Sequence, residues 1–268
     1  MFVFAHLSDT HLDGGERSAA RTRAAMDHLD ALPWDLDAVL VTGDIADNGT
    51  PAEYDTARAL LASRHPVLIG PGNHDVRGPF RENLLGEPAG DGGPINRVLR
   101  TASALYAMCD SSIPGRHDGL LAPETLAWLS GVLDESPPSL PVFVAFHHPP
   151  VELRIPFLDA IRQFGEADLA DLVARHPNIA ALLCGHVHTP AATTFAGRPL
   201  LLAPGIVSTL SLPWERGDDE GHVDPLLPPM LTFNVWDAGR LTTHYRVVGS
   251  LDTPIRDRTE AVDVIGRG

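Results

Sequence analysis

The sequence predicts an α/β protein with two β-sheets packed on each other. Over the first two thirds of the chain, short apolar runs of strand length alternate with longer runs of helical periodicity. This alternation is typical of strands joined by helices, rather than of an all-α or all-β fold. From Thr193 onward only strand patterns remain, which predicts that the late strands form a second sheet against the first. The 268 residues, of which 44% are apolar, suit a globular protein of this kind.

The expected elements follow from these runs. Strands are predicted at residues 2–7, 38–41, 67–69, 104–109, 142–146 and 179–184, and again at 193–196, 200–203, 231–236 and 241–248. Helices are predicted at residues 17–32, 51–64, 123–133 and 166–175. The second and third helices begin with Pro51 and Pro123, because proline at the first helical position lacks only an N–H that has no partner there.

One domain over residues 1–250 is expected, with two loop insertions. Residues 77–94 and 211–229 are rich in glycine and proline, and loops of this length commonly serve function or assembly. Residues 251–268 are expected to form a loosely held C-terminal tail. No internal repeat is visible in the sequence.

Composition limits the partners that the protein can have. The chain has 20 basic and 35 acidic residues and a formal charge of −15, which argues against a nucleic-acid groove because phosphate backbones bind clustered basic residues. Only Cys109 and Cys184 are present, in no metal-type pair, so no disulfide framework is expected. With no secretory leader pattern and no apolar run of membrane-spanning length, we expect a cytoplasmic protein.

Five predicted strand ends carry side chains that bind metals. Carboxyl ends of strands meet at one edge of an α/β sheet, so we expect these groups to lie together. The i, i+2 spacing of Asp9 with His11, and of His186 with His188, would place each pair on one side of an extended strand. The five stretches are D-T-H at 9–11, G-D-I-A-D-N-G at 43–49, G-N-H-D at 72–75, H-H-P-P at 147–150 and G-H-V-H at 185–188.

In this order, over roughly residues 3–190, these motifs resemble the calcineurin-like metallophosphoesterase superfamily. The stretches at 43–49, 72–75 and 147–150, with D-S-S-I-P-G-R-H-D-G at 110–119, are most similar to class III cyclic-nucleotide phosphodiesterases and glycerophosphodiester phosphodiesterases. The resemblance implies a four-layer α/β/β/α sandwich of two mixed β-sheets that carries two metal ions.

The resemblance also implies the ligands of the two ions. One metal would be held by Asp9, His11, Asp44 and His188, and the other by Asp44, Asn73, His147 and His186, with Asp44 bridging. Imidazole and oxygen ligands without thiolate suit Mn, Fe or Zn. Two ions about 3.5–4 Å apart can deprotonate a bridging water, and the resulting hydroxide would attack phosphorus in line.

The resemblance places His74 over the substrate, as general acid to the leaving oxygen or as donor to the phosphoryl group. Asp75 is expected to orient the imidazole of His74. His148 follows a ligand but should point to the other side of its strand, in a supporting or packing position. The remaining candidates are expected to pack in strands (His6, Cys184), to cap the pocket or be solvated (His222, Asp224), or to lie on the surface (His28, His65, His117, His176).

The expected function is hydrolysis of phosphodiesters in small substrates, namely 3′,5′- or 2′,3′-cyclic nucleotides or glycerophosphodiesters. Asn48 and Asp75 stand where Ser/Thr protein phosphatases of the superfamily have arginine and glutamate. Loss of that phosphate-clamping arginine favours diesters, which carry less charge than monoesters. Three alternatives stay open: a broad phosphomonoesterase, a nucleotide pyrophosphatase and an inactive binding scaffold. Related diesterases often dimerise, so a homodimer is considered, with either insertion as the contact.

Overall fold

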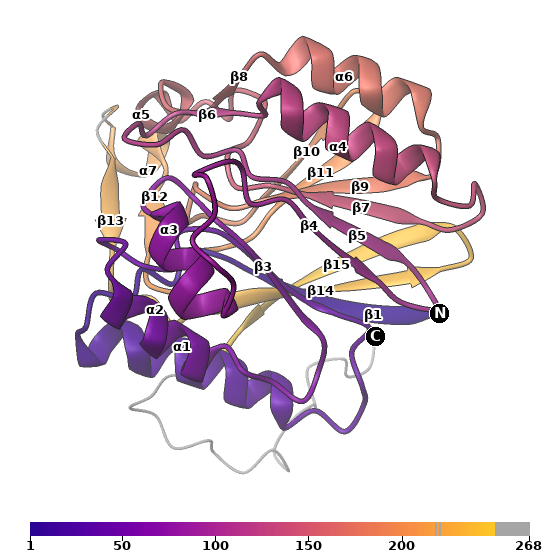
Figure 1. Cartoon of the computed structure of the whole chain (residues 1–268). Coiled ribbons are helices and arrows are strands. Elements are labelled where there is room, and N and C mark those ends of the chain that lie inside the picture. Colours follow the sequence, from indigo (N-terminus) through magenta and orange to yellow (C-terminus); the bar gives the residue numbers. More distant parts are fainter. Residues whose placement is uncertain (218, 220, 250–268) are drawn as a thin grey trace, which may run out of the picture.

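Two β-sheets lie face to face at the centre of the protein, and helices cover the outer face of each sheet (Figure 1). This arrangement confirms the expected α/β/β/α layering. The computed structural model describes residues 1–217, 219 and 221–249. The tail expected at residues 251–268 lies outside the described residues. Among the described helices, none combines the length and apolar character needed to cross a membrane.

The first sheet has the strand order β15-β14-β1-β2-β3. Strands β1 to β3 are parallel, whereas β14 is antiparallel to β1 and β15 is antiparallel to β14. Apolar side chains of α1 and α2 pack on its outer face. The elements are β1 (Phe2–Leu7), α1 (Glu16–Asp30), β2 (Val39–Thr42), α2 (Pro51–Leu60), β3 (Val67–Gly70), β14 (Met230–Asp237) and β15 (Arg240–Val247).

The second sheet has the strand order β10-β11-β9-β7-β5-β4. Its strands β5, β7, β9 and β11 are parallel to one another, and β4 and β10 form antiparallel edges. Helices α4 and α6 pack on its outer face. The elements are β4 (Arg97–Arg100), β5 (Leu105–Met108), α4 (Pro123–Asp134), β7 (Val142–Ala145), α6 (Glu166–Arg175), β9 (Ile179–Cys184), β10 (Ala191–Phe195) and β11 (Arg198–Leu202).

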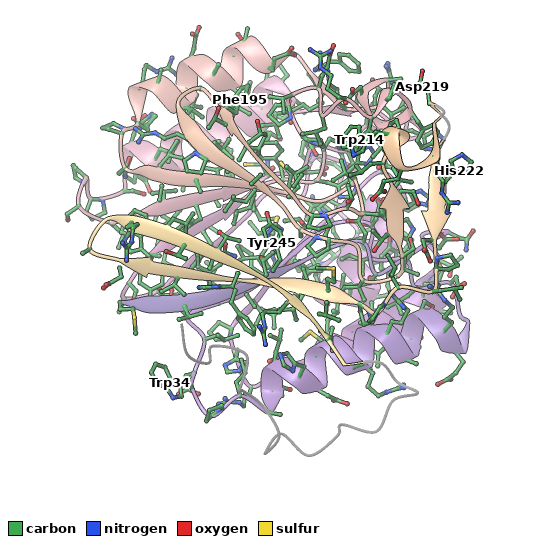
Figure 2. The ribbon with its side chains drawn as sticks, turned by 180° about the vertical axis from the view of Figure 1, so that it is seen from behind. Trp34, Phe195, Trp214, Asp219, His222 and Tyr245 are labelled. Atoms are coloured by element: carbon green, nitrogen blue, oxygen red, sulfur yellow. The ribbon has the colours of Figure 1, made fainter. Side chains whose placement is uncertain are left out.

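The late strands do not form a sheet of their own, so that prediction is wrong. The hairpin of β10 and β11 extends the second sheet beside β9, and the hairpin of β14 and β15 extends the first sheet beside β1. Hydrophobic alternation along a strand reports which face is buried, but it does not report which free sheet edge a hairpin will pair with. The hydroxyl of Tyr245 on β15 also donates to the carbonyl of Ala191 on β10, which ties the two sheets at their edges (Figure 2).

An aromatic cluster joins the two sheets. The ring of Phe143 on β7 lies 4.6 Å from that of Phe4 on β1 and 5.5 Å from that of Tyr106 on β5, and all three side chains are fully buried. Along β1, Phe4 faces this cluster while Ala5 and Leu7 face the helices α1 and α2. Burial on both faces explains why this strand is apolar except for His6, whose ring bonds to the Thr42 hydroxyl.

The two expected insertions are structured segments. Residues 77–94 include α3 (Arg77–Pro79) and a π-helical turn, η1 (Phe80–Leu85), whose Phe80 and Leu84 are buried in the core of the first sheet. A two-stranded hairpin of β12 (Thr209–Ser211) and β13 (His222–Asp224) carries the short helix α7 (Pro213–Arg216). Arg17 and Arg21 of α1 donate to backbone carbonyls on both sides of this hairpin, which anchors it.

Replacing Phe143 with alanine tests the aromatic cluster. The change removes a fully buried ring that also contacts Phe2 and Trp236, and we expect the free energy of unfolding to fall by about 3–5 kcal/mol. Urea unfolding in the presence of a chelator measures the change without metal binding. Trp34→Ala is the matched control, because Trp34 is 67% exposed and its loss should cost under about 0.5 kcal/mol. Similar losses in the two variants would contradict this account of the core.

Candidate metal centre

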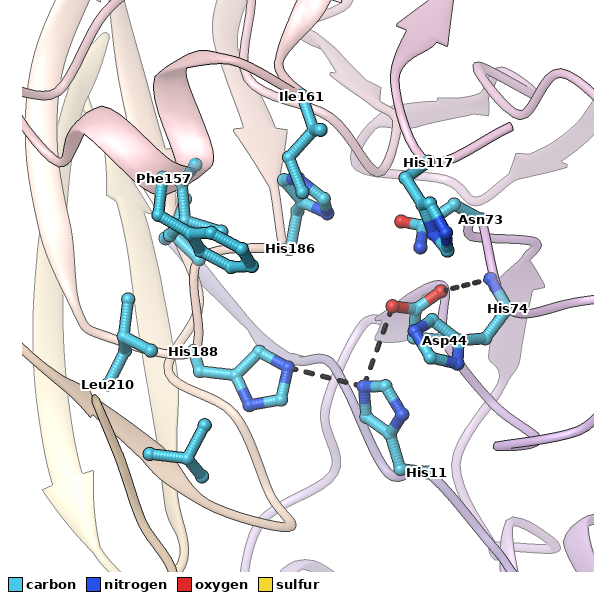
Figure 3. A pocket seen from close by; sticks show the side chains of 13 residues that line it. His11, Asp44, Asn73, His74, His117, Phe157, Ile161, His186, His188 and Leu210 are labelled. Carbon is cyan, nitrogen blue, oxygen red and sulfur yellow. Dashed lines mark hydrogen bonds and ion pairs between the residues drawn. The ribbon is translucent and has the colours of Figure 1, made fainter. Parts of the chain in front are cut away.

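The strand ends that carry the motifs converge on one pocket. Its volume is about 380 Å³, and its lining includes His11, Asp44, Asn73, His186 and His188 (Figure 3). Asp9 and His147 are fully buried beside the pocket, and their nearest side-chain atoms are 4.0 Å apart. The first sheet supplies the residues that follow β1, β2 and β3, and the second sheet supplies those that follow β7 and β9. The structure thus brings together all the residues that the sequence predicted as ligands.

The backbone at these strand ends is left-handed rather than extended. Positive φ angles occur at Asp9 (57°), His11 (38°), Asp44 (48°), His186 (70°) and His188 (54°). Such a conformation costs about 1–3 kcal/mol at a residue other than glycine and is concentrated at functional sites. The neighbouring glycines permit close approach, since a Cβ on Gly72 would lie 2.2 Å from Asp44 Oδ1.

The extended-chain argument for His186 and His188 is therefore wrong. The N–H of Val187 donates to the Gly185 carbonyl and the N–H of Thr189 donates to the Val187 carbonyl, so each histidine is the central residue of a three-residue turn. The two rings turn to different neighbours: His186 lies 5.1 Å from the His147 ring, and His188 lies 5.0 Å from the His11 ring. The rings of His186 and His188 therefore lie at two neighbouring places in the pocket and do not converge on one point.

Asp44 lies between two groups of possible ligand atoms. Its Oδ2 is 3.5 Å from His11 Nε2 and 3.2 Å from His147 Nε2. Asp9, His11 and His188 have donor atoms within 4.8 Å of one another, and so do Asp9, Asp44 and His147. A carboxylate in this position could be shared by two cations. The arrangement suits a pair of ions better than a single ion.

Among the buried side-chain atoms of the described residues that have no hydrogen-bond partner, three belong to predicted ligands: Asn73 Oδ1, His147 Nε2 and His186 Nε2. A buried polar atom without a partner costs about 1–3 kcal/mol, and native proteins rarely leave one so. His147 Nδ1 donates to the Thr42 carbonyl at 2.6 Å, so Nε2 is the ring nitrogen that would bind a metal once it is deprotonated. A cation would satisfy all three atoms, which are the ones that the motifs assign to the second metal.

On the other side of Asp44, hydrogen bonds hold the Nδ1 atoms of His11 and His188. His11 Nδ1 is 3.0 Å from Asp47 Oδ1, and His188 Nδ1 is 2.9 Å from Ser208 Oγ. The two Nε2 atoms of these histidines then face each other at 3.2 Å. Two nitrogens that both point lone pairs at one position need a proton or a cation between them, which fits the first metal.

The charges in the site favour a cation. Burial raises the pKa of Asp44, but the charges of His147 and His11 outweigh it and hold that pKa well below its usual range. Burial lowers the pKa of His147, but Asp44 and Asp9 outweigh it and raise that pKa to about 9. Protons on these imidazoles stand where a metal would bind, so metal binding should release them.

Asp75 does not orient His74, so that prediction is wrong. Its buried carboxylate accepts hydrogen bonds from the N–H groups of Ile45, Ala46 and Gly72 and from the hydroxyl of Tyr54. Burial and the charge of Asp44 raise the pKa of Asp75 to about 6. The carboxylate therefore fastens the loop after β2 to the loop after β3 and positions Asp44 and Asn73 indirectly.

Sequence reasoning gave no role to Asp47, which fills the place expected of Asp75. The Asp47 carbonyl accepts from His74 Nδ1 at 2.9 Å, and its carboxylate is the partner of His11 Nδ1. The signal was present, because Asp47 is the second carboxylate of the stretch at 43–49.

The predictions for the other histidines are confirmed for His148 and His117 and wrong for His65. His148 is buried with both ring nitrogens within hydrogen-bond distance of Ser111 Oγ and the His117 carbonyl, so it supports the site and is not free to bind metal. His65 was expected on the surface, but it is buried and its ring contacts the backbone of Leu29 and Leu36. His117 is exposed as expected, yet it lines the pocket. No feature of the sequence indicated that position.

The chain is similar to known proteins over most of its length. Residues 2–190 match the calcineurin-like phosphoesterase family. The chain is 33% identical over 233 residues to a cAMP/cGMP dual specificity phosphodiesterase of Mycobacterium tuberculosis (strain CDC 1551 / Oshkosh), covering 82% of this chain and 72% of the relative. It is 31% identical over 238 residues to the glycerophosphodiester phosphodiesterase GpdQ of Enterobacter lignolyticus (strain SCF1), covering 85% and 84%.

Solved structures share the fold. A dimetal phosphatase from Danio rerio superposes with a TM-score of 0.63 at 16% identity, covering 92% of this chain and 99% of that one. The purple acid phosphatase PPD1 from yellow lupin superposes with a TM-score of 0.64 at 14% identity, covering 92% and 51%. The match to the family extends over most of the chain and includes every strand end that supplies the pocket. The chain belongs to the calcineurin-like phosphoesterase family, whose fold implies a dinuclear metal centre.

Proposed function

We propose that this chain hydrolyses phosphodiester bonds of small substrates with two metal ions. The observation that carries the proposal is the set of unpartnered buried atoms on Asn73, His147 and His186, next to a carboxylate shared with a second group of ligands. Relatives named as cyclic-nucleotide and glycerophosphodiester phosphodiesterases support the substrate class.

The proposed ligand sets use Asp44 twice. Asp9, His11, Asp44 and His188 would hold one ion, and Asp44, Asn73, His147 and His186 the other. Nitrogen and oxygen donors without a thiolate suit Mn, Fe or Zn. When bound, the two ions supply Lewis acidity toward water and toward the phosphoryl oxygens. The chain positions the substrate beside them and handles the proton of the leaving oxygen.

His74 is proposed to act on the leaving group. Its backbone N–H donates to Asp44 Oδ1 at 2.9 Å, and its Nδ1 is held by the Asp47 carbonyl, so the ring is fixed at the pocket wall with its side chain 35% exposed (Figure 3). With Nδ1–H engaged, Nε2 can donate a proton only from the imidazolium form. That form would protonate the leaving oxygen or donate a hydrogen bond to the phosphoryl group.

The charge of the pocket favours diesters over monoesters. The described residues that line it include neither lysine nor arginine, so only the metals and the histidines can offset substrate charge. A monoester dianion brings one charge more than a diester. Asn48, which stands where protein phosphatases have an arginine, donates from its side-chain amide to Glu53 at the start of α2 and is engaged there.

We further propose a cytoplasmic enzyme, and dimerisation stays a prediction.

The first test compares bis(p-nitrophenyl) phosphate with p-nitrophenyl phosphate, using protein stripped of metal and reloaded with Mn²⁺. We expect the diester to be cleaved at least tenfold faster in kcat/KM. Stripped protein and the Asp44→Asn variant should lose about 10³-fold or more, because transition-state charge is then no longer neutralised. A dominant monoester rate would favour the phosphatase alternative, and no rate on either substrate in metal-loaded protein would favour the scaffold.

The second test separates the two roles of His74. p-Nitrophenolate leaves without protonation, whereas the alkoxide of a cyclic nucleotide requires it. If His74 is the general acid, His74→Asn should lower kcat on 3′,5′-cyclic AMP by about 10²- to 10⁴-fold and kcat on bis(p-nitrophenyl) phosphate far less. Equal losses on both would indicate donation to the phosphoryl group. Unchanged rates on both would remove His74 from the mechanism.

The third test concerns Asp75 as a positioning residue. In Asp75→Asn, an amide NH₂ must face N–H donors that now meet a carboxylate oxygen, so the loops after β2 and β3 should loosen. We expect metal affinity, measured by dialysis against buffered Mn²⁺ and elemental analysis, to fall about 10- to 100-fold. Asp171→Asn, an exposed carboxylate on α6, is the matched control. Full metal occupancy with normal affinity in Asp75→Asn would refute this role.

A further inference from the structure

The pocket has two unlike sides (Figure 3). His74 and His117 lie on one side together with Asn73, and Asp44 and His11 lie between them and His188. The apolar residues of the lining, here called the apolar wall, are Phe157, Leu158, Ile161, Val187, Leu210 and Val223. Figure 3 shows Phe157 and Leu210 across the pocket from His74 and His117. None of the assigned metal or proton-transfer roles uses this wall.

The apolar wall leaves large side chains open to solvent beside the reaction centre. Phe157 is 52% exposed and Val223 is 58% exposed, although both line the pocket. Exposed apolar side chains cost little when scattered, but several gathered on one wall of a concave site are typical of a surface that binds apolar ligand groups. The wall is therefore a candidate for substrate recognition.

The apolar wall is also held in place. Phe157 lies in α5 (Pro156–Asp159), where the Asp159 carboxylate accepts from the N–H groups of Leu153 and Ile155 at 2.7 and 3.1 Å. Its ring packs closely on Gly221 of the neighbouring hairpin, since a Cβ at that glycine would lie 2.8 Å from the ring. The anchored hairpin supplies Leu210 and Val223. A wall fixed before binding loses little entropy when a ligand group docks on it.

The position of His74 indicates which substrate group meets the wall. If His74 serves the leaving oxygen, the leaving group lies on the His74 side of the phosphorus. In an in-line displacement the attacking oxygen stands opposite the leaving oxygen, so the substituent that stays on phosphorus projects sideways and away from His74, where Phe157 can meet it. The described lining residues contain one acid, Asp44, which faces the metal positions, so the wall offers no counter-ion to a cationic substituent.

We propose that the apolar wall selects phosphodiesters whose retained substituent is a flat, uncharged ring system, an aryl group or a nucleobase, and that Phe157 stacks on it. The inference rests on the proposed phosphodiesterase function and names the residues that choose among its substrates. Small alkyl substituents and cationic ones bind less well on this wall.

The test uses three diesters that share the p-nitrophenolate leaving group: the methyl, phenyl and choline esters of p-nitrophenyl phosphate. Mn²⁺-loaded wild type and Phe157→Ala are compared by kcat/KM on each. The variant should lower the phenyl-to-methyl ratio about tenfold, the usual effect of losing one aromatic stacking partner. Its rate on the methyl ester should stay within about twofold of wild type. Dividing one ratio by the other cancels the intrinsic reactivity of the esters.

Matched variants define the outcomes. Trp214→Ala removes an aromatic ring of α7 that is 66% exposed but does not line the pocket, and it should leave the ratio unchanged (Figure 2). Val223→Ser should lower the ratio by a smaller factor, and Phe157→Tyr should keep it. An unchanged ratio in Phe157→Ala overturns the inference while leaving phosphodiesterase activity intact. A wild-type preference for the choline ester that disappears in Phe157→Ala overturns it too, in favour of cation binding. Failure to cleave any of the esters overturns the proposed function first.

Discussion

Two carboxylates, Asp9 and Asp44, are buried at the junction of the two sheets, and a buried anion requires compensation that apolar packing cannot give. Imidazoles supply part of it from both sides: His11 comes from the first sheet, while His147 and His188 come from the second. Metal ions would complete the compensation and would tie the sheets together at this end. The aromatic cluster around Phe143 joins the same sheets farther along the strands. The site and the fold therefore share one interface.

This junction also explains how strained residues are tolerated. The left-handed residues at the strand ends are paired by backbone hydrogen bonds to neighbouring loops: Asp9 N–H donates to the Gly43 carbonyl, His11 N–H to the Asp44 carbonyl, and Val207 N–H to the Asp9 carbonyl. Asp75 adds a carboxylate that accepts three further N–H groups. The loops thus determine one another's conformation, and the ligand atoms are held before any metal arrives, which lowers the cost of assembling the site.

The chemistry of the site was more predictable from sequence than its geometry. Motifs at successive strand ends indicate a common sheet edge, because parallel strands deliver their carboxyl ends to the same side. The spacing of His186 and His188 led to a wrong geometry. The two histidines lie in tight local turns and not in an extended strand, and nothing in the residue types at these positions indicates such turns. The sequence also does not indicate which sheet the strands after Thr193 join, because edge pairing depends on which edges the earlier strands leave free. His65 and Asp75 show that burial of a polar side chain depends on partners distant in sequence.

The two sides of the pocket have different structural origins, with a consequence for how specificity can change. The metal-binding side comes from strand ends fixed by both sheets, where a shift in one ligand disturbs the others through Asp44. The apolar wall comes mostly from α5 and the β12–β13 hairpin, whose Leu158 and Leu210 pack on the core of the second sheet while Arg17 and Arg21 hold the hairpin from α1. Substitutions in the wall change which substituent fits, while the buried charges stay where they are. Metal chemistry and substrate choice can therefore vary separately in this architecture.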